Sequence, residues 1–141
     1  MKSAFTILSV FFLFTQCTEN ESENIILPKL ISASVSSFDN DFPYYHVEFT
    51  GKFNEGQDPV KDIRIAGSKN ISNDPRSFSL GKSVQLLDSH TFSGEFEIEF
   101  FSPYYIAFYF ISENAATYSE IYSFSFVDNK PVFKQVFPEK R

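Results

Sequence analysis

Apolar and polar residues alternate along most of the chain, and two segments show the alternation most clearly. In residues 45–53, the two faces are Tyr45, Val47, Phe49 and Phe53 against His46, Glu48, Thr50 and Lys52. In residues 92–100, they are Phe92, Phe96, Ile98 and Phe100 against Glu95, Glu97 and Glu99. A period of two residues is typical of a β-strand that buries one face in a core. Both segments are therefore predicted to be strands.

Further segments carry weaker versions of the same pattern. They are residues 30–35, 61–66, 78–86, 104–111 and 122–126. Polar stretches at residues 54–59 and 67–76, rich in Asn, Asp, Gly and Pro, indicate turns or loops between them. No later segment shows a sustained helical period, and no internal repeat is present. About seven short strands predict a single all-β module, an antiparallel β-sandwich over residues 28–127.

The first residues have a different pattern. Lys2 precedes an apolar run at residues 4–14, and Cys17, the only cysteine, follows. The run is too short for a membrane-spanning helix, which needs roughly 20 residues, and it is typical of an export signal. It resembles a bacterial lipoprotein signal peptide, which is helical. The resemblance implies that residues 1–16 are removed and that Cys17 receives the lipid.

One residue departs from that signal. Gln16 stands where lipoprotein signals usually have a small residue, so a plain secretory signal with a free thiol at Cys17 is the alternative. Residues 18–23 are acidic and polar and resemble the export signal of Bacteroidetes-type lipoproteins. That resemblance implies a lipid anchor in the outer membrane, at the cell surface, with residues 17–27 as a tether. A simple solvated tether explains the same composition.

The predicted sandwich resembles the fibronectin type III-like domains of Bacteroidetes surface proteins, over roughly residues 30–127. The matching segments, in order, are residues 48–53, 58–60, 91–98, 102–109 and 118–124. Ala107 departs from the family, which has arginine at that place. The resemblance implies an immunoglobulin-like arrangement of about seven strands.

The tyrosine-rich segment at residues 104–111 has two apolar faces. Its even-numbered residues, Tyr104 to Phe110, are predicted to face the core between the sheets. Tyr105, Tyr109 and Ile111 then point outward as an apolar patch, which is a candidate binding surface because exposed patches of this kind often mark partner sites. Cross-strand aromatic packing that only stabilises the sheet is the alternative.

The net charge and the composition limit the classes of partner that the protein is expected to bind. The formal charge of −6 disfavours binding to a nucleic acid or to an anionic lipid surface, so attachment to a membrane would depend on the lipid anchor. A single cysteine allows no intrachain disulfide. The 19 Phe and 7 Tyr must therefore supply the core, apart from the Phe residues of the leader.

Residues able to support catalysis or metal binding are few. His46 and His90 have no second histidine at a metal-binding spacing. The run 88–90, Asp-Ser-His, has the residue types of a catalytic triad, but adjacent residues in one turn do not usually meet its geometry. The glutamates on alternate positions of residues 95–99 are ~6–7 Å apart, too far to share one calcium ion. We predict no catalytic residue, no metal site and no cofactor.

The expected function is a non-catalytic, lipid-anchored cell-envelope protein with a binding or spacer β-sandwich for a protein or glycan partner. An accessory or inhibitory lipoprotein that acts on a neighbouring envelope protein, for example by strand addition at a sheet edge, is the first alternative. An enzyme is the second. The tail, residues 128–141, could extend the last strand, fold back over the sandwich or dock on a partner. The sequence gives no oligomeric state.

Overall fold

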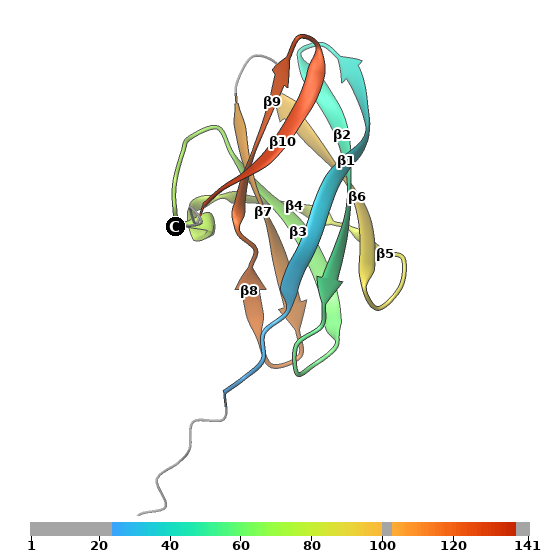
Figure 1. Ribbon diagram of the computed structural model, residues 1–141, viewed down its shortest axis with the longest axis vertical. Helices are drawn as coiled ribbons and strands as arrows, with labels where there is room; N and C mark the ends of the chain where they lie inside the picture. Colours follow the sequence, from blue (N-terminus) through green and yellow to red (C-terminus); the bar gives the residue numbers. More distant parts are fainter. Residues whose placement is uncertain (1–23, 100–102, 138–141) are drawn as a thin grey trace, which may run out of the picture.

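The computed structural model describes residues 24–99 and 103–137, which form two antiparallel β-sheets packed face to face (Figure 1). The first sheet has the order β1-β2-β6-β5, with β1 Lys29–Asp41, β2 Tyr44–Asn54, β6 Thr91–Glu99 and β5 Gln85–Leu86. The second has the order β10-β9-β7-β3-β4, and β8 pairs with β7. Its strands are β10 Lys130–Phe137, β9 Ile121–Val127, β7 Tyr104–Ser112, β3 Val60–Ser68, β4 Ser79–Ser83 and β8 Ala116–Tyr118.

This strand order defines an immunoglobulin-like sandwich. In that fold, strands A, B, E and D make one sheet, and C, F and G make the other. Here β1, β2, β6 and β5 take the first set of places, and β3, β7 and β9 take the second, with β4 beside β3. The predicted all-β antiparallel sandwich is confirmed. The strands number ten in the described residues, because β4, the short β8 and the C-terminal β10 add to the basic set of seven.

Aromatic and branched side chains from both sheets form the main core. The first sheet contributes Val47, Phe49, Phe53, Phe92 and Ile98, and the second contributes Ile63, Ile65, Ile106, Phe108, Phe110 and Phe124. Phe49 meets both Phe108 and Phe124 edge to face, with ring centroids about 6 Å apart. The inward parity predicted for residues 45–53 and 104–110 is confirmed. Phe100, also predicted to face inward, lies outside the described residues.

Strand β1 corrects one feature of the predicted pattern. The alternation at residues 30–35 predicts that Ile31 faces inward together with Ala33 and Val35. In the structure Leu30 is the buried residue, with 4% of its surface exposed, and Ile31 is 57% exposed. A register shift between Leu30 and Ser32 causes the change, because a bulge adds one residue and reverses the facing of what precedes it. The strand also continues to Asp41, beyond the segment whose alternation is visible in the sequence.

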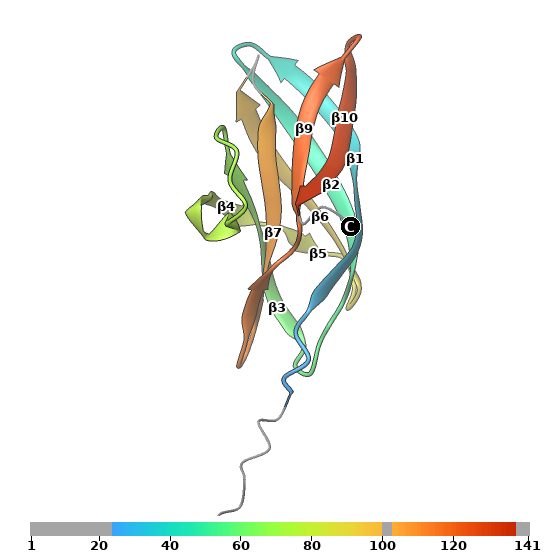
Figure 2. The same ribbon diagram turned by 60° about the vertical axis from the view of Figure 1, so that its left-hand side comes forward.

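The C-terminal tail folds back as an added strand. Asp128 and Asn129, both with positive φ (51° and 58°), form a two-residue hairpin turn of the kind that Asn and Asp favour. Strand β10 then pairs with β9, and Phe133 stacks on Tyr122 with 4.8 Å between ring centroids. It lies beside β1 at one edge of the sandwich (Figure 2). The sheet therefore continues to Phe137, past the predicted limit at Val127.

Candidate binding surfaces

The candidate residues Tyr105, Tyr109 and Ile111 point away from the main core, as the parity predicts, but all three are half-buried. Tyr105 packs against a second apolar cluster on the outer face of the second sheet, formed by Ala66, Phe78, Ala107 and Ile121. Tyr109 stacks on Tyr118 of β8, with ring centroids 4.4 Å apart. Tyr118 is the cross-strand neighbour of Tyr109. Part of this face is therefore covered by other segments and part is packed across strands, and partner binding by these three residues stays a prediction.

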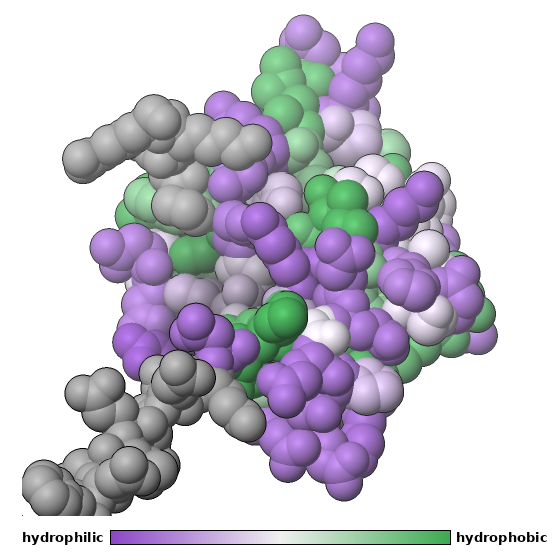
Figure 3. Space-filling view, turned by 60° about the horizontal axis from the view of Figure 1, so that its bottom comes forward, coloured by the Kyte–Doolittle hydropathy of each residue, from purple (hydrophilic) through white to green (hydrophobic). Residues whose placement is uncertain are grey.

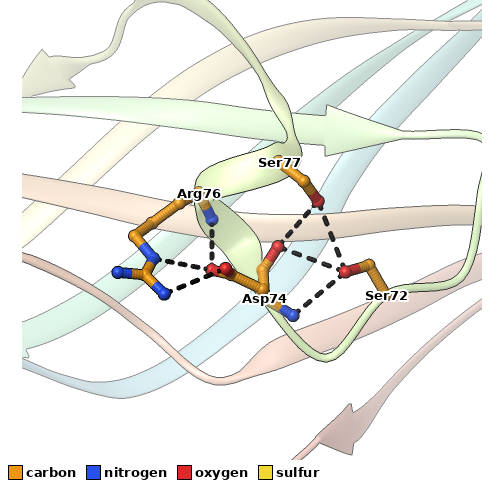
Figure 4. Close-up of polar contacts among 4 residues, drawn as sticks. All are labelled: Ser72, Asp74, Arg76 and Ser77. Carbon is orange, nitrogen blue, oxygen red and sulfur yellow. Dashed lines mark hydrogen bonds and ion pairs between the residues drawn. The ribbon is translucent and has the colours of Figure 1, made fainter.

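The segment between β3 and β4 supplies part of that cover. It carries Phe78 into the second cluster, and it is held in shape by hydrogen bonds among four polar residues (Figure 4). The carboxylate of Asp74 accepts from the backbone N–H of Arg76 at 3.0 Å and from the Arg76 guanidinium at 2.9 and 3.0 Å. The Ser77 hydroxyl donates to the Asp74 carbonyl at 2.8 Å, and the Asp74 N–H donates to the Ser72 hydroxyl at 3.0 Å.

These bonds also shift two pKa values. The hydrogen bonds from the Arg76 side chain and backbone lower the pKa of Asp74, and the bond to Asp74 raises the pKa of Arg76. This charge-assisted pair shapes the loop locally, and Phe78 is the residue that joins the loop to the second cluster. Because Ala107 is small, Phe78 and Ile121 can pack closely against β7.

A different set of aromatic side chains is exposed at the end of the β1–β2 hairpin. Phe42 is 70% exposed, Phe38 43% and Tyr44 39%, and we call these three residues the hairpin tip. The turn between the strands is Phe42–Pro43. The ring of Phe38 packs edge to face against Phe126 of the other sheet, with ring centroids 5.4 Å apart. The tip is therefore an ordered part of the sandwich that presents aromatic surface to solvent.

The tip and the N-terminal segment lie at opposite ends of the molecule, because β1 runs the whole length between them (Figure 1). Residues 24–28 leave the domain beside the β2–β3 turn, where the Gln57 N–H donates to the Ile26 carbonyl at 2.7 Å. Viewed from this lower end, the surface is mostly polar, and apolar side chains appear in small separate patches (Figure 3).

Next to the tip, the outer face of the first sheet carries three rows of paired residues. The rows are Asp41, Tyr44 and Glu99; then Asp39, His46 and Glu97; then Ser37, Glu48 and Glu95. We call the six carboxylates in these rows the acidic face. Among the described residues, only Glu99 of the six pairs with a lysine or arginine, the partner being Lys69. The face is therefore strongly negative.

Two carboxylates of this face are held by neighbours. Glu48 accepts hydrogen bonds from the hydroxyls of Ser93 and Ser37 at 2.6 and 2.9 Å. These bonds, that from Ser93 above all, lower the pKa of Glu48, because they favour its ionised form. His46 Nδ1 lies 3.1 Å from Glu95 Oε1. The side chains surround an open depression of about 710 Å³, lined by residues 37–41 together with His46, Glu48 and Glu95.

The residues considered for metal binding and catalysis are not assembled into such sites. In residues 24–99 and 103–137, no three or more His, Cys, Asp or Glu side chains are grouped so as to hold a metal ion. Ser89 Oγ lies 2.7 Å from His90 Nδ1, but Asp88 accepts from the backbone N–H of His90 rather than from its ring. A carboxylate that does not orient the ring leaves the triad geometry incomplete.

The sequence contained a signal for the hairpin tip. Residues 36–44 combine polar and acidic residues with Phe38, Phe42 and Tyr44 around Pro43, so large aromatic side chains fall in a turn. Turns lie at the surface, and aromatic residues in them are exposed unless another segment covers them. The stretch lies between the predicted strands at residues 30–35 and 45–53, and no structure was predicted for it.

Comparison of the chain with protein-family models, with characterised proteins and with solved structures finds no match in any of the three. No helix in the described part of the chain is long and apolar enough to cross a membrane. The predicted signal peptide, residues 1–16, and the predicted lipid attachment site, Cys17, lie outside the described residues.

Proposed function

We propose that this protein is a non-catalytic, lipid-anchored module of the cell envelope that binds a protein or glycan partner through its hairpin tip. We also propose that its sandwich is of the fibronectin type III kind. The observation that carries the proposal is the position of exposed aromatic side chains at the end of the domain farthest from the N-terminal segment. A module tethered by its N-terminus would present that end to its surroundings.

The dimensions support this arrangement. From Lys29 to Asp41, β1 extends about 40 Å, given a rise of about 3.3 Å per residue. The tether from Cys17 to Asn24 adds up to about 25 Å when extended, at about 3.5 Å per residue. An anchored domain would therefore hold the tip well clear of the lipid headgroups.

The anchor itself is supported by the sequence alone. A cationic start, a short apolar run and Cys17 directly after it are the parts of a lipoprotein signal. Because the net charge of the protein is negative, anionic lipids are not expected to attract it to a membrane. Stable membrane attachment would then require more than one acyl chain, as a modified N-terminal cysteine supplies.

The alternative, an accessory or inhibitory lipoprotein that pairs its sheet edge with a neighbour, needs an edge strand open to pairing. Strand β10 ends the second sheet and lies beside β1, the edge strand of the first. Lys130, Pro131 and Lys134 of β10 and Asp39 and Asp41 of β1 are residues of the kind that oppose edge-to-edge pairing. We therefore place docking at the tip ahead of strand addition.

The anchor is tested by the intact mass of protein extracted from membranes, beside a Cys17→Ser variant, and by protease treatment of whole cells. We expect a mature chain that begins at Cys17 with added acyl mass and that disappears on treatment. The serine variant should lack the added mass and leave the membrane fraction. An unmodified, soluble wild-type protein would contradict the anchor.

The binding role is tested separately by placing a photo-crosslinking amino acid at Phe42 in cells. Leu87 is a matched control, because it is 55% exposed and lies in the turn between β5 and β6, at the opposite end of β6 from Glu99. We expect a discrete crosslinked species from position 42 and none from position 87. Equal crosslinking at both positions, or none at either, would argue against a binding tip.

A further inference from the structure

We propose that the hairpin tip and the acidic face beside it dock a basic segment of a partner protein, rich in lysine or arginine and carrying at least one apolar side chain. This inference rests on the proposed binding role and specifies the chemistry of the partner.

The negative charge of this surface favours a positively charged partner. The three rows next to the tip hold six carboxylates and no lysine or arginine, and Lys69, which pairs with Glu99 from outside the rows, balances one of the six. Glu48 and Glu95 occupy opposite positions on β2 and β6, a placement of like charges that sheets usually disfavour. Here the hydroxyls of Ser93 and Ser37 hold the Glu48 carboxylate and His46 holds that of Glu95, so both stay on this face without a lysine or arginine partner. Cationic side chains of a partner would complement this negative potential.

The tip supplies the apolar part of the same surface. Phe42 is the most exposed large aromatic residue among the described ones, and Tyr44 belongs to both the tip and the first row of the acidic face. Aromatic residues dominate the energetics of many interfaces, and their rings also attract lysine and arginine through cation–π contacts. Carboxylates and rings in one patch therefore suit a segment that mixes basic and apolar residues.

The shape of the surface favours a segment of protein over a small ligand or a bilayer. The depression lined by residues 37–41, His46, Glu48 and Glu95 is open to solvent, whereas small-molecule sites enclose most of their ligand. Anionic lipid would be repelled by the carboxylates. An extended or loop segment could lie across the rows with its charges facing them.

The test is an NMR titration of the full ¹⁵N-labelled chain with short synthetic peptides. One peptide alternates lysine with tyrosine, one alternates glutamate with tyrosine, and one alternates lysine with serine. We expect the lysine–tyrosine peptide to bind most tightly, with amide shifts confined to residues 37–48 and 95–99. Its affinity should fall as salt is added, because exposed charges are screened.

Two charge variants separate the site from general acidity. Asp39→Asn with Asp41→Asn removes two exposed charges of the acidic face, and we expect affinity to fall roughly fivefold to tenfold. Glu55→Gln with Glu113→Gln removes the same charge at the other end of the domain and should leave affinity unchanged. Phe42→Ser should weaken binding to a similar extent, while Leu87→Ser, which removes an exposed apolar side chain at the other end of the domain, should not.

Some results would overturn only the basic partner, and others would also overturn the proposed binding function. Equal losses in the site and control variants, shifts spread over the whole surface, or equal binding of the glutamate peptide would each overturn the proposal. Absence of peptide binding together with crosslinking at position 42 in cells would refute the basic partner while leaving the binding role in place. Loss of both would remove the proposed binding function as well.

Discussion

Replacing Phe108 tests the central packing of the sandwich. Its side chain is fully buried at the middle of β7 and lies against three aromatic rings, with centroids 5.2 Å from Phe92, 6.2 Å from Phe49 and 6.3 Å from Tyr122. Phe108→Ala removes the contacts that this ring makes with both sheets, and neighbouring rings can only partly fill the space it leaves. A buried Phe→Ala change costs about 3–5 kcal/mol, a large share of the about 5–15 kcal/mol that stabilises a typical domain.

The measurement is urea unfolding followed by tyrosine fluorescence, together with a thermal scan. For a domain of this size we expect Tm to fall by roughly 10–20 °C. Tyr109→Ala is the matched control, because the neighbouring side chain points to the other face, is only half-buried and has Tyr118 as its ring partner. Its cost should be no more than about half as large.

A charged residue gives the limiting case. Phe108→Asp should prevent folding, since an unpaired carboxylate cannot be buried at this position. If Phe108→Asp showed a cooperative unfolding transition, or if Tyr109→Ala cost more than Phe108→Ala, the inward face of β7 would be assigned wrongly.

Three further predictions follow from the fold. Leu30→Ala should cost about 2–3 kcal/mol in urea unfolding and Ile31→Ala less than about 0.5 kcal/mol, and the reverse order would refute the bulge in β1. The lowered pKa values of Asp74 and Glu48 contribute stability that is present above the ordinary carboxyl pKa, about 4, and that is lost as the pH falls through the lower folded values. Asp74→Asn should therefore flatten the acid side of a plot of Tm against pH, and an unchanged slope would contradict the Asp74–Arg76 pairing. Ending the chain at Val127 removes β10 and uncovers Tyr122 and Phe49, so Tm should drop, and an unchanged Tm would show that the hairpin adds nothing.

Most of the sandwich could be predicted because its strands bury one face each. In β2 and β6 the alternation of apolar and charged residues indicates which side chains face the core, and matching those faces restricts the register of the pair to shifts of two residues. The bulge in β1 could not be predicted, since Leu30 and Ile31 are equally apolar and only the pairing with β2 decides between them.

The candidate site was harder to predict because it depends on contacts between distant segments. Tyr105 and Tyr109 point outward, as their positions require, but the cover over them comes from Phe78, Tyr118 and the tail. The hairpin tip was missed because residues 36–41 are almost all polar. They form a strand through backbone pairing with β2 and bury little side-chain surface.

The course of β1 has a mechanical consequence for a tethered protein. The covalent path from the N-terminal segment to the hairpin tip is this single strand, which is already close to the full extension of a polypeptide. If the proposed partner pulls on the tip, the load therefore falls along the axis of β1, and the strand itself can lengthen very little. The remaining strands lie outside this line of force, so the core of the sandwich can stay intact under tension.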